Sequence, residues 1–344
     1  MLAKFFQIFS GSSKAHGVSR GRPGDPAAGE APKSDKNTHE DDRARMSQEV
    51  EQSFIGLLLG VHSLENGEMS SFEKSFLASA KKIYLGDSMP EALLPRMPMV
   101  VPRAMQALRH NDTNASELAK ILSSDIVLVS DLIRLSNSAF YARGKSLNSV
   151  EDAIVNIGFK GIRQLVIGAA MKPILSASVG HLIKISSRYL WDTSMRAGLL
   201  SDAVAAKMNE NRFHAYLASM TAYTGMAVLI QHLDHHFNDH EVPRTRAFMS
   251  ALNRFAAEVT VRISQQWELP EAVIRAQQEQ FTVMSPYAMT TLGQITYHTG
   301  MLVKVRTLKA NGLSPAKLTI DSLGMGSRLS EVYAQLEAEH LALE

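Results

Sequence analysis

Three histidines at four-residue intervals are the residues of this chain whose types and spacing come closest to a metal site. His232, His236 and His240 would share one face of a helix. Two neutral imidazoles at this spacing can chelate zinc or nickel. Asp239 lies beside that face, and Pro243 indicates that the helix ends here in an exposed loop. We therefore expect adventitious zinc or nickel binding here and no physiological metal site.

Other residue patterns that could support catalysis are missing. The sequence has no Gly-x-Ser-x-Gly elbow, no phosphate-binding Gly-x-x-x-x-Gly-Lys loop and no Gly-x-Gly-x-x-Gly turn. It has no cysteine, which excludes disulfides, thiolate zinc sites and a cysteine nucleophile. No Ser-His-Asp arrangement is indicated, and no catalytic residue is assigned.

The charge balance argues against a nucleic-acid partner. The chain of 344 residues carries 36 Lys and Arg against 34 Asp and Glu, without a basic run. The length allows two modest domains. No apolar run approaches the ~20 residues of a membrane span. The apolar residues 1–9 could make a weak peripheral contact with a membrane. We expect a cytoplasmic protein.

The helices that must position any site begin near residue 46. Residues 1–45 hold few large apolar side chains after the first nine, which predicts a disordered tether. Residues 46–93 predict a helical hairpin packed on the first lobe of the following domain. The hairpin's two apolar faces have helical spacing: Val50, Phe54, Leu57, Leu58 and Val61 on the first helix, then Phe72, Phe76, Ala80 and Ile83 on the second.

The rest of the sequence predicts an all-α fold. The runs 121–135 and 190–208 are apolar at helical spacing, and no strand-like alternation occurs. Asn114 or Ser116 is expected to cap a helix, as is Ser70 or Ser71. Residues 312–344 predict a C-terminal helical extension, whose last helix carries Val332, Leu336 and Leu341.

Five ordered sequence blocks resemble the HDOD domain, the metal-dependent hydrolase-related output domain. They read LPRMP at 94–98, AKILSSD at 119–125, IRLSNSAFY at 133–141, SVEDAIVNIG at 149–158 and GIRQL at 161–165. The third is the best match, and Arg134, Asn137, Ser138 and Tyr141 form its signature. The resemblance covers residues 94–311. It implies a multi-helical HD-like bundle in two helical lobes.

The resemblance also implies which positions would hold metal, and ligands are missing there. Ala222 and Tyr223 stand where the family has a His-Asp pair. Thr193 and Ala256 stand at two further histidine positions. Glutamines occupy or neighbour a later histidine pair, at 277 and 278, and no Asp occurs between Asp239 and Asp321. Because hard divalent cations need several oxygen or imidazole donors, we expect a degenerate site without metal or cofactor.

The signature residues allow two interpretations. They could form a recognition surface for a protein partner or a small polar ligand. Alternatively, Asn137 and Ser138 satisfy backbone groups at a helix end, while Tyr141 packs with its hydroxyl at a polar rim. We favour the second interpretation, because polar side chains at helix ends commonly act in this way.

For function, the resemblance implies a non-catalytic output or adaptor protein of bacterial signal transduction that binds a protein partner. Two alternatives stay open. One is a metal-dependent phosphohydrolase with a relocated site. The other is a nucleotide-binding sensor that uses the old pocket at Thr193, Ala222 and Tyr223. A filled apolar cavity there would favour the adaptor, and a positively lined cleft would favour the sensor.

Overall fold

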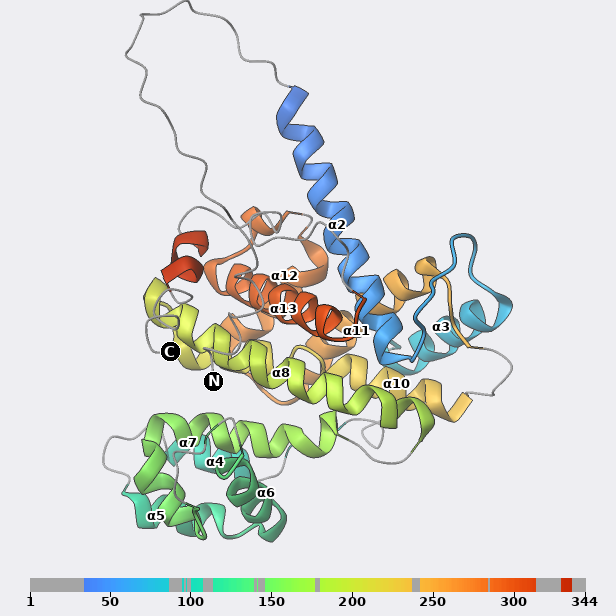
Figure 1. Cartoon of the computed structure of the whole chain (residues 1–344). Helices are drawn as coiled ribbons and strands as arrows, with labels where there is room; N and C mark the ends of the chain where they lie inside the picture. Colours follow the sequence, from blue (N-terminus) through green and yellow to red (C-terminus); the bar gives the residue numbers. More distant parts are fainter. Residues whose placement is uncertain are drawn as a thin grey trace, which may run out of the picture.

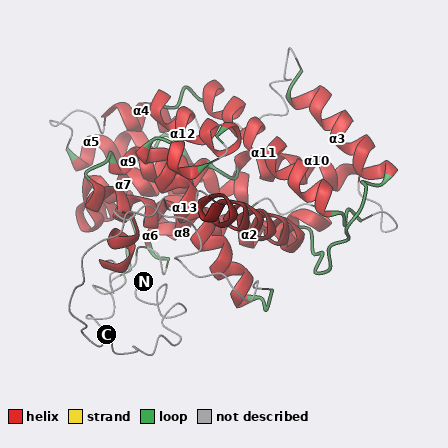
Figure 2. Cartoon of the chain, turned by 90° about the horizontal axis from the view of Figure 1, so that it is seen from above, coloured by secondary structure: helices red, strands yellow, loops and turns green. Residues whose placement is uncertain are grey.

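The structure is a computed structural model in which every regular element is a helix (Figure 2). It describes residues 34–86, 95, 97, 100–107, 114–138, 141, 146–176, 180–236, 242–283, 285–313 and 329–335. Within these ranges, extended pairing is limited to one isolated bridge between Glu65 and Thr245. The predicted all-α class is confirmed.

The helices form two lobes, as predicted (Figure 1). The first lobe contains α4 (Val100–Ala107), α5 (Ala115–Leu122), α6 (Ile126–Ser136) and α7 (Val150–Leu175). The second contains α8 (His181–Met208), α9 (Arg212–Thr221), α10 (Thr224–His236), α11 (Arg246–Gln266), α12 (Glu271–Thr282), the 3-10 turn η2 (Pro286–Ala288) and α13 (Thr291–Ala310). Helix α7 packs on both α6 and α9 and so joins the lobes.

Local sequence explains where several helices begin. The side chains of Asn114, Asp125 and Ser149 accept hydrogen bonds from backbone N–H groups in the first turns of α5, α6 and α7. Gly158 interrupts α7 with a φ of 80°, a backbone conformation that side chains other than glycine strain to adopt. The long helix α7 therefore consists of two segments that meet at a bend.

The N-terminal helix is longer than the sequence interpretation allowed. Helix α2 (Ser34–Leu58) begins within the segment expected to be a tether, so that expectation was wrong for residues 34–45. The segment lacks large apolar residues but holds helix-favouring Glu, Arg and Ala. Arg43 also donates to Tyr287 Oη at 3.1 Å. Residues 1–33 lie outside the described part of the chain.

The expected hairpin also packs differently. Helix α2 lies against α8, α11 and α13, and α3 (Ser71–Tyr84) lies against α10 and α11. Both helices therefore cover the second lobe, and the expectation that they pack on the first lobe was wrong. Periodicity identified their apolar faces but could not identify what those faces cover.

A buried carboxylate fixes α3 to the second lobe. Glu73 accepts hydrogen bonds from the N–H groups of Arg244 and Thr245 and from Thr245 Oγ1, at 2.8–3.0 Å. It also completes a capping box with Ser70, one of the two residues predicted to cap this helix. Burial alone would raise the pKa of Glu73. The hydrogen bonds that it accepts, of which the one from the Thr245 N–H has the largest effect, hold the pKa below its ordinary value.

Two apolar stretches have the length and composition of membrane spans, which differs from the expectation from sequence. They are Val150–Leu175 and Arg212–His235, and 56% and 83% of their apolar windows are buried inside the protein. Core helices of globular proteins meet the same criteria. At the C-terminal end, residues 329–335 are helical and bury Leu329, Val332 and Tyr333, while the rest of the predicted last helix lies outside the described residues.

Candidate functional site

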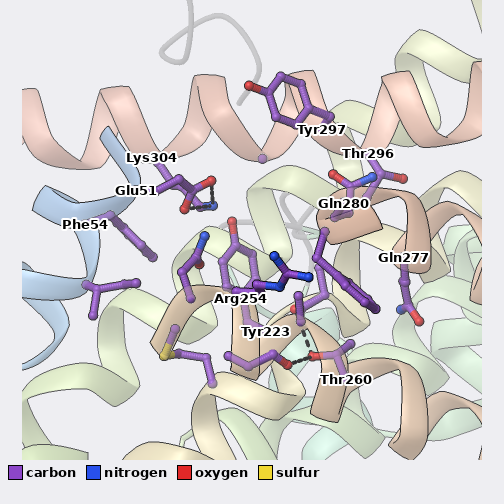
Figure 3. Close-up of a pocket in the computed structure, with 18 of the residues that line it drawn as sticks. Glu51, Phe54, Tyr223, Arg254, Thr260, Gln277, Gln280, Thr296, Tyr297 and Lys304 are labelled. Carbon is purple, nitrogen blue, oxygen red and sulfur yellow. Dashed lines mark hydrogen bonds and ion pairs between the residues drawn. The ribbon is translucent and has the colours of Figure 1, made fainter. Parts of the chain in front are cut away.

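A cavity of about 300 Å³ opens in the second lobe between α2, α8, α11, α12 and α13 (Figure 3). Ala222, Tyr223 and Ala256, three of the four positions implied by the resemblance, line it. They meet because the α9–α10 connection crosses α11 very closely. A Cβ at Gly225 would lie 2.0 Å from the carbonyl oxygen of Ala256, so only glycine fits there.

One threonine holds this crossing together. Thr260 Oγ1 lies 3.0 Å from the donating N–H of Gly225 and 2.9 Å and 3.3 Å from the carbonyl oxygens of Ala256 and Ala222. It can therefore accept from one helix and donate to either of two carbonyls. These contacts place the 222–223 backbone against α11 and set the floor of the cavity.

Tyr223 lies on the cavity wall with most of its ring covered. Its ring centroid is 6.1 Å from that of Phe54 on α2, in a tilted arrangement. Burial raises the pKa of Tyr223 to about 12, although nearby Lys304 lowers it. The phenol therefore stays neutral at physiological pH, and a neutral phenol is a poor ligand for a divalent cation.

The strongest electrostatic feature of the cavity is an ion pair that joins α2 to α13 (Figure 3). Lys304 Nζ lies 2.6 Å from each carboxylate oxygen of Glu51, and their side chains are only 11% and 19% exposed. The ammonium also lies 5.4 Å from the ring centroid of Tyr223. Burial opposes the charge on Lys304, but Glu51 keeps the lysine pKa above its ordinary value.

Sequence reasoning missed both members of this pair. Lys304 interrupts the apolar run Met301–Val305, and a lone cation in such a run was a usable signal. Its partner could not be identified, because Glu51 is 253 residues away.

The glutamines near the expected histidine pair have different positions. Gln277 is 2% exposed, lines the cavity and donates through Nε2 to Thr221 Oγ1 at 2.7 Å. Gln278 is exposed on the outer face of α12. Only the first of the two could contact anything bound in the cavity.

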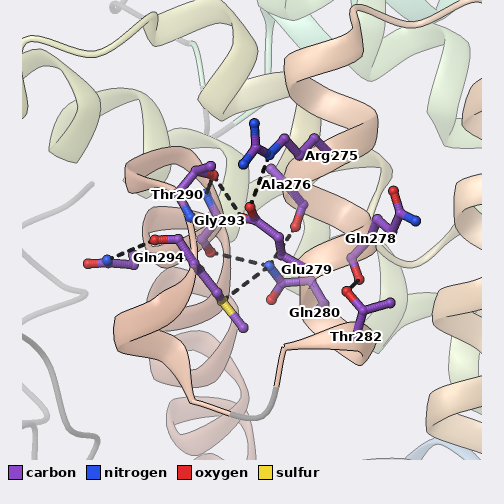
Figure 4. A network of polar contacts seen from close by, with 10 residues as sticks. Arg275, Ala276, Gln278, Glu279, Gln280, Thr282, Thr290, Gly293 and Gln294 are labelled. Carbon is purple, nitrogen blue, oxygen red and sulfur yellow. Dashed lines mark hydrogen bonds and ion pairs between the residues drawn. The ribbon is translucent and has the colours of Figure 1, made fainter.

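The next residue, Glu279, holds the start of α13 (Figure 4). It accepts from Thr290 N at 3.0 Å and from Thr290 Oγ1 at 2.7 Å, and Arg275 lies 3.4 Å away. A Cβ at Gly293 would come within 2.0 Å of the carboxylate. This carboxylate is thus committed to helix capping.

Thr193 does not reach the cavity. It is fully buried in α8, and its Oγ1 has no hydrogen-bond partner within the described ranges. Ala197, one turn further along, lines the cavity instead. The structure therefore brings together Ala222, Tyr223 and Ala256 and leaves Thr193 outside.

The signature residues of the first lobe are mainly occupied with the chain itself. Asn137 donates through Nδ2 to Leu147 O at 2.7 Å and accepts from Leu147 N at 2.8 Å, which closes the α6–α7 loop. Ser138 Oγ donates to Leu135 O at 2.6 Å.

The other two signature residues differ in exposure. Tyr141 is inserted beside Tyr216, and burial raises the pKa of its phenol. Arg134 has a side chain that is 68% exposed and lies 3.5 Å from Asp131. Of the four, Arg134 is the one most open to a partner.

The histidine series does not assemble into a metal site in the described residues. The His232 ring lies against Tyr84 and Phe76, with centroids 5.5 Å and 5.7 Å away. Helix α10 ends at His236, whose side chain is not described, and His240 lies outside the described residues. Across the described ranges, no group of three or more His, Cys, Asp or Glu side chains could hold a metal ion.

Comparison with known proteins identifies the class of this two-lobed helical domain. The sequence profile of the HDOD domain matches residues 94–282, more than half of the chain. The chain therefore belongs to the HDOD family.

Two solved structures share the fold. One is an HDOD domain protein of unknown function from Geobacter sulfurreducens, at 16% identity and a TM-score of 0.53 over 78% of this chain and 96% of that one. The other comes from Shewanella amazonensis SB2B and is named for a suspected metal-dependent phosphohydrolase activity. It matches with the same identity and TM-score, over 79% of this chain and 100% of its own.

An uncharacterized protein of Treponema pallidum (strain Nichols) is 23% identical over 195 residues. The match covers 53% of this chain and 36% of the Treponema protein, so it spans about a third of that protein's length.

Proposed function

We propose that this HDOD protein is a non-catalytic component of bacterial signal transduction that acts through protein contacts. The cavity is neither filled nor wholly apolar, so that criterion for an adaptor is not met, and the observation that carries the proposal is the scarcity of metal-binding groups in the lining. Ala222, Tyr223 and Ala256 offer no carboxylate or imidazole, and the nearby carboxylate of Glu51 is already bound by Lys304.

Electrostatics support this proposal. A divalent cation at this wall would lie beside the Lys304 ammonium in a poorly solvated place, where like charges repel strongly. To coordinate the ion, Glu51 would have to break its ion pair with Lys304. The lysine ammonium would then be buried without a partner. Metal-assisted hydrolysis needs a bound water acidified by the ion, so a wall that disfavours the ion disfavours the reaction.

Exposed apolar side chains on the first lobe support a contact function. Ile126 and Val127 on α6 are 81% and 69% exposed, and Val155 on α7 is 71% exposed. Helices α6 and α7 pack on each other, so these side chains belong to one small lobe. Where exposed apolar residues lie together on one surface, they are typical of protein–protein contact sites. We assign the partner contact to this lobe.

The competing function is metal-dependent phosphohydrolysis, the activity for which the Shewanella protein is named. The test is an assay of the full chain with bis(p-nitrophenyl) phosphate and cyclic dinucleotides in the presence of Mg²⁺, Mn²⁺, Fe²⁺ or Co²⁺. We expect no turnover above the uncatalysed rate. Metal-dependent turnover that is lost in a folded Arg254→Ala variant would contradict the proposal, because Arg254 lines the cavity.

The contact surface is tested separately. Val127→Asp combined with Val155→Asp places charges on the exposed faces of α6 and α7, where no core packing is disturbed. We expect the double variant to keep its thermal stability and to lose most binding to the partner that wild-type protein captures from its host. If the double variant captures the partner as well as wild-type protein does, the contact surface does not lie on these faces of α6 and α7.

A further inference from the structure

The walls of the cavity combine aromatic rings with carboxamides. Phe54, Tyr223, Phe281 and Tyr297 provide the rings. Gln48, Asn253, Gln277 and Gln280 provide four neutral amides. Rings stack on flat apolar surfaces, while amides pair with ligand N–H and C=O groups. Its size of about 300 Å³ lies at the lower end of the range for small-molecule sites.

Some of these polar groups have hydrogen-bonding capacity to spare. Gln277 Oε1 is buried and accepts no hydrogen bond from the described residues. Its orientation is fixed, because Nε2 donates to Thr221 Oγ1, which itself donates to Leu217 O. Asn253 lines the same cavity, and its amide offers a donor and an acceptor. A buried acceptor without a donor is costly, so a ligand N–H or a water is required there.

The charges around the cavity cancel in pairs. Lys304 is bound by Glu51, and Arg254 Nε lies 3.3 Å from Glu258 at the rim. Each cation in the lining is therefore paired with a carboxylate, Lys304 with Glu51 inside the cavity and Arg254 with Glu258, which lies outside the lining. A phosphate would have to compete with Glu51 for Lys304 or with Glu258 for Arg254, which disfavours nucleotides against their uncharged counterparts.

We propose that this cavity binds an uncharged planar heterocycle with N–H and carbonyl groups, of nucleobase or nucleoside size. The inference rests on the proposed function, because binding without hydrolysis would make the protein a ligand-responsive signalling component. Helix α2, which lies outside the segment matched by the family profile, supplies Gln48, Glu51 and Phe54. The site is thus completed by a part of this chain that the family segment does not contain.

The test uses calorimetric titration of the full chain with adenine, guanine, uracil, their ribonucleosides and the matching 5′-monophosphates. We expect saturable binding of at least one uncharged compound, with the matching monophosphate at least about tenfold weaker. The proposal would be overturned if a monophosphate binds as tightly as its uncharged counterpart or more tightly. It would also be overturned if none of the uncharged compounds shows saturable binding.

Two variants locate the binding. Asn253→Ala removes one cavity amide and is expected to weaken binding about tenfold. Gln265→Ala removes an exposed amide from the same helix, α11, and is the matched control with unchanged affinity. Ala257→Trp fills the cavity from α11 and is expected to abolish binding while the protein stays folded. Binding that is unaffected by both Asn253→Ala and Ala257→Trp would place the ligand elsewhere and overturn the proposal.

The outcomes separate this inference from the proposed function. Failure of all uncharged compounds to bind would leave a non-catalytic protein without this ligand. Metal-dependent hydrolysis would contradict the proposed function whether or not an uncharged compound binds.

Discussion

The signature residues of the first lobe and the residues that line the cavity of the second lobe differ in their contacts. In the first lobe, Asn137 and Ser138 match the family pattern, and their side chains close a loop and bond the end of α6. In the second lobe, Ala222 and Tyr223, which stand where the resemblance implies a His-Asp pair, line an accessible cavity.

On the proposed function, this difference separates the residues that build the domain from the positions at which the resemblance implies metal ligands. Helix ends and loop closures use short-range hydrogen bonds whose loss destabilises the fold. Positions 222 and 223 lie at a cavity wall, where alanine and tyrosine can stand without leaving a hole in the core. The Glu51–Lys304 pair and the Tyr223 ring then supply contacts of their own at the cavity wall.

The largest effect is expected from breaking the ion pair. Lys304→Met leaves Glu51 half-enclosed and unpaired, and we expect the free energy of unfolding to fall by about 3–5 kcal/mol. The double variant with Glu51→Gln should recover most of this loss, because no lone charge remains. Urea unfolding of the four proteins of this cycle measures the coupling. Purely additive losses would mean that the pair does not hold α2 on α13.

A somewhat smaller effect is expected from restoring the His-Asp pair. Ala222→His with Tyr223→Asp deletes a buried ring, which typically costs about 3–5 kcal/mol. The new carboxylate can pair with Lys304, so we expect a net loss of about 2–4 kcal/mol. Metal-dependent phosphodiesterase activity should stay absent, since two donors do not complete a ligand set. Turnover by this variant would show that the cavity needs only the pair to become catalytic.

The signature segment allows a matched pair of substitutions in one helix turn. Asn137→Ala removes the bridge to Leu147 and should lower the free energy of unfolding by about 1–3 kcal/mol. Arg134→Ala removes an exposed side chain with a weak ion pair and should change it by less than about 0.5 kcal/mol. Thermal unfolding compares the two. A larger loss of stability from Arg134→Ala than from Asn137→Ala would contradict the assignment of Asn137 as the residue that closes the α6–α7 loop.

The sequence predicted the features that depend on neighbours within a few turns. The apolar face of Phe54 and Leu58 is a local pattern that the structure contains, and the two predicted caps, each left open between two residues, are Ser70 and Asn114. The family blocks added the two-lobed arrangement, which local patterns alone could not define.

The features that sequence reasoning missed depend on contacts across the chain. The packing surface of α2 follows from how its face fits α11 and α13, and periodicity cannot identify that partner. Thr193 was placed at the site by alignment, but one helical turn separates it from the residue that lines the cavity, Ala197. The Glu51–Lys304 pair forms only once two distant helices have packed.

The metal content of the purified chain tests the central claim most directly. Elemental analysis after removal of any affinity tag should find far less than one iron, manganese, zinc, cobalt or nickel ion per chain. Replacing the three histidines of the 232–240 series by alanine should remove any residual zinc or nickel. About one ion per chain that persists in this triple variant, and that is lost when Ala257→Trp fills the cavity, would contradict the account.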